Sequence, residues 1–384
     1  AYVKRLAEEW NDQIHGSEDN IIDVIPWSHK ITLDIIGESA FNYRFDALSN
    51  TPNELSQALK DLDKVAGNDV TALTILLITL QSYIPAFLSS LQAKYLPTPT
   101  EKTAKRYREL STAKARELMR EAELTDGRDV LSVLVRANSA EDQKKQLNEA
   151  EILAQISTII QAGSHTTAYT LSWILYELAT HPADQTKVYE EIKRVRKDRG
   201  DLELMNEDYD SMNHLTLVLK ETLRLHPVFP KLLREARKND ILSLDFPVVS
   251  EGGKTIKEIP IMKGQRIWVD ATMYSRLEGV WGPNPNKWNP RRHEILSSEE
   301  KKIAQVGLFA NVLAFSGGPK GCIGWRFALM ELQALITGLI ERFEFSILPD
   351  IEIDTVSFAL DVPAVKGKER MGAQLPLKVT TRSG

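Results

Sequence analysis

Apolar residues recur three and four positions apart through about the first 230 residues of the chain. That spacing predicts amphipathic helices, because positions three and four apart share one helix face. One segment, 148–181, is apolar nearly all round, so we expect a central, buried helix that ends before Pro182. Further helices are expected at 1–14, 21–41, 101–124, 182–198 and 215–227.

The pattern changes after Pro227. Segment 241–275 consists of short β-rich runs punctuated by Gly and Pro, which predicts small antiparallel strands. An irregular stretch rich in Pro and Trp follows at 280–295, and short strands return from Phe343. The fold class should therefore be mainly α with a minor β portion (α+β). Its two parts are expected at about 1–230 (helical body) and about 231–384 (β-rich portion).

Composition excludes some functions. The net charge of −5 on 384 residues is mild, so a nucleic-acid-coating role has no support and we expect no nucleic-acid partner. The single cysteine cannot form an intramolecular disulfide, so nothing ties the chain to an oxidising compartment.

The sequence contains neither a signal peptide nor a transmembrane helix. The most apolar stretch, Val70–Leu88, carries four polar side chains and is interrupted by Pro85, so a buried or partly exposed amphipathic helix is favoured over a membrane span. The helical pattern begins at Ala1 with no capping residue ahead of it. We therefore expect a fragment that begins inside an element of a longer parent.

The only cysteine, Cys322, lies in the stretch FSGGPKGCIGWRFALME (315–331). A thiolate binds metals, and both a following helix N-terminus and the nearby Lys320 favour that form. The surrounding glycines allow a close backbone approach, so a flat cofactor could lie against the loop. The alternative is a structural thiol on a turn.

Two other stretches carry candidate chemistry. Glu221 and Arg224 are three positions apart on a predicted helix, hence on one face, and their apolar flanks suggest a buried pair. Such spacings also occur by chance on helix surfaces. The run QAGSHTTAYT (161–170) places poor helix formers inside the buried helix, which indicates either a local distortion that leaves a groove for a ligand, or close helix–helix packing.

Together these stretches resemble the cytochrome P450 family of haem-thiolate monooxygenases, with a fungal, microsomal character. The family's cysteine loop, Phe-x-x-Gly-x-basic-x-Cys-x-Gly, is matched at five positions. Its Glu-x-x-Arg helix, its third network Arg and its Ala-Gly-x-acid-Thr-Thr motif are matched too. The matching residues are Phe315, Gly318, Lys320, Cys322 and Gly324, then Glu221, Arg224 and Arg292, then Ala162, Gly163, Thr166 and Thr167. The resemblance implies that 1–384 is a single P450 catalytic domain, incomplete at its N-terminus.

The resemblance also implies a role for each matching residue. Cys322 would be the axial thiolate of haem b, with Lys320 and Arg234 contacting the haem propionates. Thr166 would hydrogen-bond dioxygen and help to deliver protons. Glu221, Arg224 and Arg292 would hold the loop geometry. The remaining cofactor-binding positions would be Phe315, Gly318, Gly324, Ala162 and Gly163.

Two departures from the family pattern stand out. His165 occupies the position of the usual acid, so we expect it to take part in proton relay and to alter oxygen coupling; the alternative is a helix-packing residue that points away from the haem. The family's Trp-x-x-x-Arg helix has no match, since Trp10 is followed by Ile14 and the Trp288–Arg292 pair lies in the irregular stretch.

The expected function is insertion of one atom of O2 into a hydrophobic small molecule, with electrons from NADPH-cytochrome P450 reductase. The alternative is a truncated fragment that binds haem without turnover or holds none. The full-length parent is expected on the cytosolic face of the endoplasmic reticulum membrane. The substrate pocket is expected from Val70–Leu91, Gln155–Thr167, Pro227–Arg234 and Phe358–Lys366.

Overall fold

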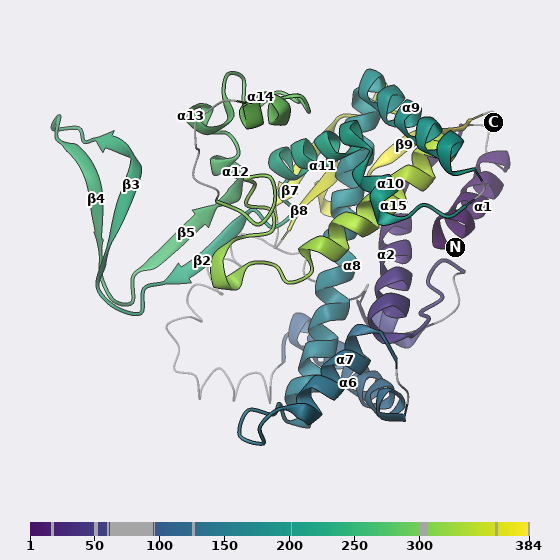
Figure 1. The fold of residues 1–384 in the computed structure, drawn as a ribbon, viewed down its shortest axis with the longest axis horizontal. Helices are drawn as coiled ribbons and strands as arrows, with labels where there is room; N and C mark the ends of the chain where they lie inside the picture. The colour runs from purple at the N-terminus through teal and green to yellow at the C-terminus, as the bar shows by residue number, and fades with distance from the viewer. Residues whose placement is uncertain are drawn as a thin grey trace.

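A computed structural model describes the chain except residues 17–18, 50–52, 60, 62–94, 96, 125–126, 201, 299–305, 358–359 and 383–384. The expected helix at 70–88 and the whole of the expected pocket segment Val70–Leu91 lie outside the described residues. In the described part, a helical body precedes a set of small sheets, as the pattern predicted (Figure 1).

The helical body surrounds one long central helix, α8 (Glu149–Thr180). Its start is fixed by a capping box, in which Asn148 Oδ1 accepts from the Glu151 amide and Glu151 Oε2 accepts from the Asn148 amide. Its end at Thr180 agrees with the predicted break at Pro182. The other helices of the body are α1 (Tyr2–His15), α2 (Val24–Phe41), α6 (Pro99–Leu124), α7 (Val130–Ala140), α9 (Pro182–Arg199), α10 (Asn206–Asp210) and α11 (Asn213–Leu225).

The second part of the chain contains small antiparallel sheets. Strands β2 (Lys231–Glu235) and β5 (Arg266–Asp270) pair antiparallel, as do β3 (Asp240–Val249) and β4 (Thr255–Ile261), whose hairpin projects from the body (Figure 1). Helix α15 (Trp325–Arg342) follows the cysteine loop. The remaining elements are α12 (Ala271–Tyr274), α13 (Glu278–Trp281), α14 (Arg292–Ser298), β6 (Phe343–Ser346), β7 (Ile353–Ser357), β8 (Asp361–Val365), β9 (Pro376–Thr381) and 3₁₀ turns at Gly318–Lys320 and Glu369–Met371.

Two predicted boundaries were wrong. The segment 21–41 is helical only from Val24, because β1 (Ile21–Asp23) pairs with β9, and the Asp23 carboxylate caps the helix through the Ile25 amide. The stretch expected to be irregular, 280–295, contains the end of α13 and the start of α14. In both places a partner distant in sequence decides the local conformation.

The core lies on both sides of α8. Its C-terminal half packs with α1, α9, α11, α15 and the sheet β1–β9–β6, and its N-terminal half packs with α2, α6 and α7. A third cluster joins Leu223 of α11 to Trp281, Val312 and Leu329, so it connects the helical body to the cysteine loop and α15. This cluster positions the candidate site relative to α11.

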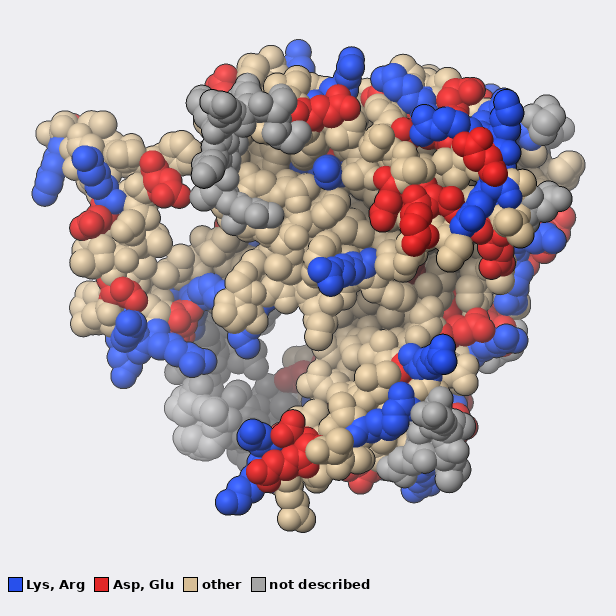
Figure 2. All heavy atoms as spheres, viewed as in Figure 1, with Lys and Arg blue, Asp and Glu red and all other residues tan. Residues whose placement is uncertain are grey.

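The surface is mixed in charge. On the face drawn in Figure 2, side chains of both signs gather over α9 and α10, and the middle of the face is mostly uncharged. Among the described helices, none is long and apolar enough to cross a membrane.

Candidate active site

The cysteine loop presents its thiol to solvent. Cys322 is exposed, and its amide donates to the Phe315 carbonyl at 2.9 Å, which closes the loop ahead of α15. Gly318 has φ +64, a conformation that L side chains rarely adopt, so glycine is required there. A Cβ at Gly321 would lie 2.7 Å from the Leu308 side chain, which explains a second glycine. The loop is therefore shaped by backbone constraints and leaves the sulfur free.

The small residues of α8 separate onto two faces. A Cβ on Gly163 would approach Ile36 of α2 to 2.9 Å, and the Ser164 carbonyl accepts from the Thr32 hydroxyl at 3.0 Å. Gly163 and Ser164 therefore serve the close crossing of α2 and α8. The neighbouring Ala162 is exposed and Thr166 is half-exposed, so the other face is open.

The open face keeps its backbone bonds. The helix α8 is α-helical throughout, so it lacks the local distortion that was one of the two interpretations of its run of weak helix formers. The Thr166 hydroxyl donates to the Ala162 carbonyl at 2.7 Å, so its oxygen remains able to accept a further hydrogen bond.

His165 lies on the packed side of α8. It is buried, and its ring centroid is 5.1 Å from that of His29 in α2, which in turn meets Tyr169 edge-on at 4.7 Å. This placement is the packing alternative stated for His165. Its role in proton relay stays a prediction.

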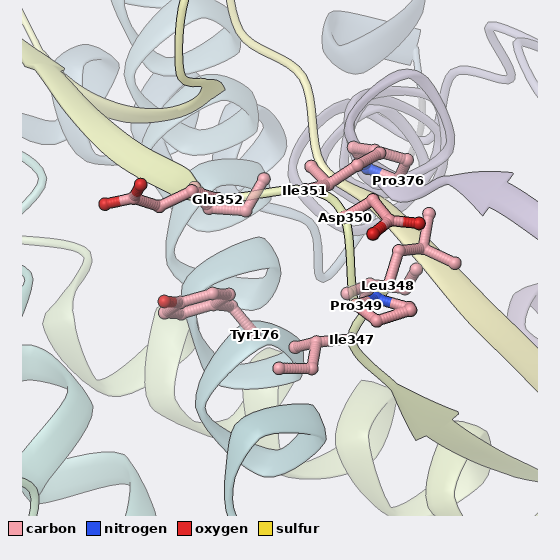
Figure 3. A pocket seen from close by; sticks show the side chains of 10 residues that line it. Tyr176, Ile347, Leu348, Pro349, Asp350, Ile351, Glu352 and Pro376 are labelled. Carbon is pink, nitrogen blue, oxygen red and sulfur yellow. The ribbon is translucent and has the colours of Figure 1, made fainter.

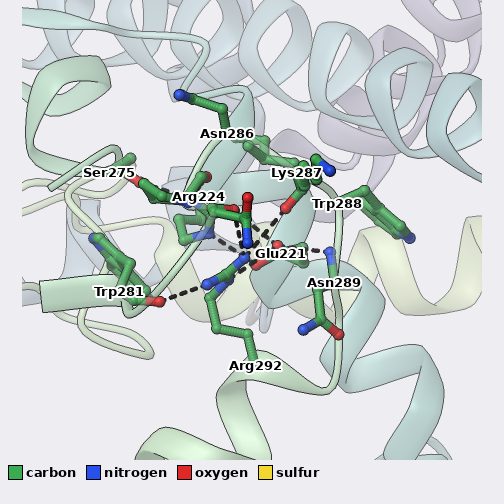
Figure 4. A network of polar contacts seen from close by, with 12 residues as sticks. Glu221, Arg224, Ser275, Trp281, Asn286, Lys287, Trp288, Asn289 and Arg292 are labelled. Carbon is green, nitrogen blue, oxygen red and sulfur yellow. Dashed lines mark hydrogen bonds and ion pairs between the residues drawn. The ribbon is translucent and has the colours of Figure 1, made fainter. Parts of the chain in front are cut away.

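Glu221 and Arg224 form a fully buried ion pair. Both are completely inaccessible, and the guanidinium donates from Nε and Nη2 to the two carboxylate oxygens, at 2.8 Å each (Figure 4). Arg292 approaches the same carboxylate, with its Nε 3.5 Å from Oε1. The structure therefore brings together the three residues that the resemblance grouped.

The network holds backbone that precedes the cysteine loop. Arg224 Nη1 donates to the Ser275 and Pro285 carbonyls, both at 2.6 Å. Arg292 donates to four carbonyls, those of Trp281, Pro283, Asn284 and Lys287, which fixes this irregular stretch (Figure 4). Among the described residues, these bonds stop short of the loop itself. The connection to the loop runs through Trp281, which packs in one cluster with Val312 and Leu329.

Two further partners of the Glu221 carboxylate, Asn289 and His293, were not predicted from the sequence. The Asn289 amide donates to Glu221 Oε1 at 2.9 Å, and His293 Nε2 lies 3.1 Å from Oε2. Burial alone would raise the pKa of Glu221, but hydrogen bonds from Arg224 and His293 outweigh it and lower that pKa to about 2. Burial also lowers the pKa of His293, despite the opposing effect of Glu221. The only signal for His293 was its position next to Arg292.

The geometry agrees with the comparison to known proteins. A sequence model of the family described as Cytochrome P450 matches residues 1–364. The chain belongs to the cytochrome P450 family.

Several fungal P450s are similar to this chain. Cytochrome P450 monooxygenase 205 of Postia placenta is 32% identical over 391 residues, covering 98% of this chain and 70% of the relative. Ganoderic acid synthetase CYP5150L8 of Ganoderma lucidum is 30% identical over 361 residues, covering 89% and 66%. Cytochrome P450 monooxygenase claU of Ampulloclitocybe clavipes is 28% identical over 389 residues, covering 99% and 70%. The predicted family, fold class and oxidoreductase class are thereby confirmed.

A P450 requires a surface for haem, and the residues present fit one. Exposed apolar side chains follow the thiol in the sequence: Ile323 is 100% exposed, Phe327 36% and Met330 47%. Isolated apolar residues on a surface are ordinary, but three within eight positions of an exposed soft ligand match the chemistry of a flat apolar group bound through iron. A Cβ on Gly324 would meet nothing within 4 Å, so this side of the loop is open.

The other predicted haem contacts stay predictions. Lys320 is exposed and Phe315 half-buried beside the thiol. Arg234 lies on β2 and is exposed, with its Nη1 donating to the Leu233 carbonyl at 3.0 Å. Neither cation has a carboxylate partner among the described residues, so both are available to an anionic group.

Two of the expected pocket segments lie together. The Asp361 amide of β8 donates to the Val228 carbonyl at 2.8 Å, and the Asp361 carbonyl accepts from the Trp173 indole of α8 at 3.3 Å. The turn after α11 and the β7–β8 hairpin are therefore neighbours beside α8. Residues 358–359 of the predicted segment lie outside the described part.

Proposed function

We propose that this chain is a haem-dependent monooxygenase that inserts one atom of O2 into a hydrophobic small molecule. The observation that carries the proposal is the exposed Cys322 thiol at the start of α15, in a loop whose glycines and apolar neighbours leave room for a flat cofactor. When bound, haem supplies the oxygen activation, and the protein supplies ligation, orientation and proton control.

In this proposal the residues near the cysteine loop and on the open face of α8 have separate roles. Cys322 would hold the iron through its sulfur. Exposed Lys320 and Arg234 bind the carboxylates of the cofactor. The Thr166 hydroxyl, on the open face of α8, holds a proton at Oγ1 and can accept another hydrogen bond.

The electron donor in this proposal is NADPH-cytochrome P450 reductase. Arg326 is exposed and its guanidinium lies 4.9 Å from the Trp325 ring centroid, which holds a positive charge at the start of α15, the helix that follows the cysteine loop. Such charges speed the encounter with an acidic partner. Location at the cytosolic face of the endoplasmic reticulum membrane belongs to the same proposal.

The substrate class is supported by the apolar character of the neighbouring surface. The open face of α8 offers small side chains such as Ala162, and Phe229 in the turn after α11 is 45% exposed. Apolar walls with few polar groups are typical of pockets for hydrophobic ligands.

Haem stoichiometry and a carbon monoxide difference spectrum test the proposal. Purified protein supplied with haem should bind one equivalent, and its reduced carbon monoxide complex should show the red-shifted band of thiolate ligation. Cys322→Ala should lose that band, whereas Arg326→Ala should keep it and slow only reduction by the reductase. A chain that binds no haem, or whose band survives in Cys322→Ala, is not the enzyme proposed.

A further inference from the structure

A cavity of about 470 Å³ opens where the segment after β6 passes the C-terminal half of α8 (Figure 3). Its wall includes Tyr176 of α8, the segment 347–353 and the start of β9. Pockets that bind small molecules have volumes of about 300–1,000 Å³, so this cavity is large enough for one. None of the residues assigned to the haem site lines it.

The cavity is preformed. Tyr176 is held edge-on against Trp173, with ring centroids 5.6 Å apart. The Ile351 amide donates to the Leu348 carbonyl at 3.2 Å, and the Lys366 amide donates to the Glu352 carbonyl at 2.9 Å, which fix both ends of the lining segment. A binding site that already has its shape loses little entropy when a ligand arrives.

The lining is mixed, with apolar side chains, the Tyr176 hydroxyl and two carboxylates. The apolar part comes chiefly from Ile347, Leu348, Pro349, Ile351 and Leu377. Figure 3 shows the Glu352 carboxylate and the Tyr176 hydroxyl at one side of the cavity and Asp350 at the other.

Only one of these carboxylates is neutralised. Glu352 pairs with Lys366, whose Nζ is 2.8 Å away. Asp350 has no hydrogen bond or ion pair within the part of the chain that the structure describes. Burial, followed by the nearby Glu177 charge, raises the pKa of Tyr176, so its hydroxyl stays neutral and able to donate. The cavity therefore combines several apolar side chains with one exposed negative charge, Asp350, that has no partner among the described residues.

We infer that this cavity is a binding site for a small organic cation with an apolar body, such as an alkylammonium. The apolar body would contact the isoleucine and leucine side chains, and the ammonium group would lie beside the exposed Asp350 carboxylate. The inference goes beyond the proposed oxygenation and does not depend on it, because it uses none of the haem-site residues.

Calorimetric titration of the purified chain with octyltrimethylammonium tests the inference. A quaternary ammonium cannot coordinate iron, so its binding is not confused with ligation at a haem. We expect one saturable site, about fivefold weaker in Asp350→Asn, since one exposed charge contact is removed. The matched control is Asp354→Asn, which removes an exposed carboxylate from the same segment outside the cavity lining and should change affinity less than twofold.

Two further measurements test separately where the ligand binds and whether its positive charge is needed. Ile347→Trp fills the cavity mouth from a side chain that is 45% exposed, so the variant should fold, as circular dichroism will verify, and should abolish binding. Octan-1-ol, with the same tail and no charge, should bind at least tenfold more weakly. Unchanged affinity in both Asp350→Asn and Ile347→Trp overturns the site, and equal affinity for octan-1-ol overturns the assignment of a cation.

Discussion

Replacing Arg224 by Ala should strongly destabilise the fold. The substitution leaves the Glu221 carboxylate fully buried with fewer partners, and it leaves the Ser275 and Pro285 carbonyls without their donor. Removing one member of a buried ion pair costs about 3–5 kcal/mol. Since domains are stable by only about 5–15 kcal/mol, the variant should lie close to the threshold of folding.

The pKa of Glu221 gives a second estimate of the stability lost in Arg224→Ala. A decrease from 4.5 to about 2 corresponds to about 3 kcal/mol of preferential stabilisation of the charged form. Arg224 shares this effect with His293, but the two carbonyls that lose a donor add about 1 kcal/mol each. Both routes lead to a loss of about 3–5 kcal/mol for Arg224→Ala.

The pH dependence follows from the sign of the shift. The folded pKa of Glu221 is lowered, so its stabilising contribution is complete above about pH 4.5 and is lost as the pH falls toward 2. Arg224→Ala raises that pKa toward its ordinary value. The gap between wild type and variant should therefore be widest near neutral pH and narrow below pH 4.5.

Urea unfolding at pH 7 and pH 4 measures both effects. The matched control is Arg196→Ala. Arg196 also donates two hydrogen bonds to a glutamate, from Nε and Nη2 to the Glu341 carboxylate oxygens at 2.7 and 3.3 Å, but it is partly exposed. That variant should lose less than about 1 kcal/mol. If the two variants lose equal stability, or the loss in Arg224→Ala does not depend on pH, the reasoning from burial fails.

Three further predictions concern other parts of the chain. The hydrogen bond to Glu177 raises the pKa of His181. The stability that this interaction contributes is therefore complete below about pH 6.5 and is lost as the pH rises above it. Glu177→Gln should reduce the resulting decrease in melting temperature between acidic and alkaline pH. Gly163→Ala should destabilise by about 1–2 kcal/mol, because the new Cβ meets Ile36, and a double variant with Ile36→Val should recover part of the loss in urea titrations. Burial without any hydrogen-bond partner among the described residues raises the pKa of Glu331 well above 4.5, so Glu331→Gln should be the more stable protein at pH 8, and the difference should vanish near pH 4.5.

The sequence predicted the elements and the networks better than the surroundings of single residues. Three-residue spacing was enough to place Glu221 and Arg224 on one face, and the resemblance added Arg292. The pattern carried no comparable signal for His293, because it joins the carboxylate through tertiary contact alone. The strand at Ile21–Asp23 was missed for the same reason, since its partner β9 lies more than 350 residues away along the chain.

The run of small residues in α8 shows most clearly where sequence reasoning stops. Glycine, serine and threonine in a buried helix fit a ligand groove and a close helix crossing equally well, and the choice depends on what faces each position. Gly163 faces Ile36 of α2, and the Ser164 carbonyl accepts from Thr32 of the same helix, so both residues serve the close helix crossing. Ala162 and Thr166 lie outside this crossing, on the face of α8 that is open to solvent.

The same division of faces restricts how His165 can act. Side chains adjacent in a helix point about 100° apart, so a ring packed toward α2 cannot also lie on the open face with Thr166. The His165 ring is buried against His29, and His29 is half-exposed and meets Tyr169. A proton that reached Thr166 by way of His165 would therefore have to arrive through the His29 side of the crossing, a route set by α2. An acid at position 165 would face that same imidazole, so the packing of α2 against α8 would govern this route with either residue at the position.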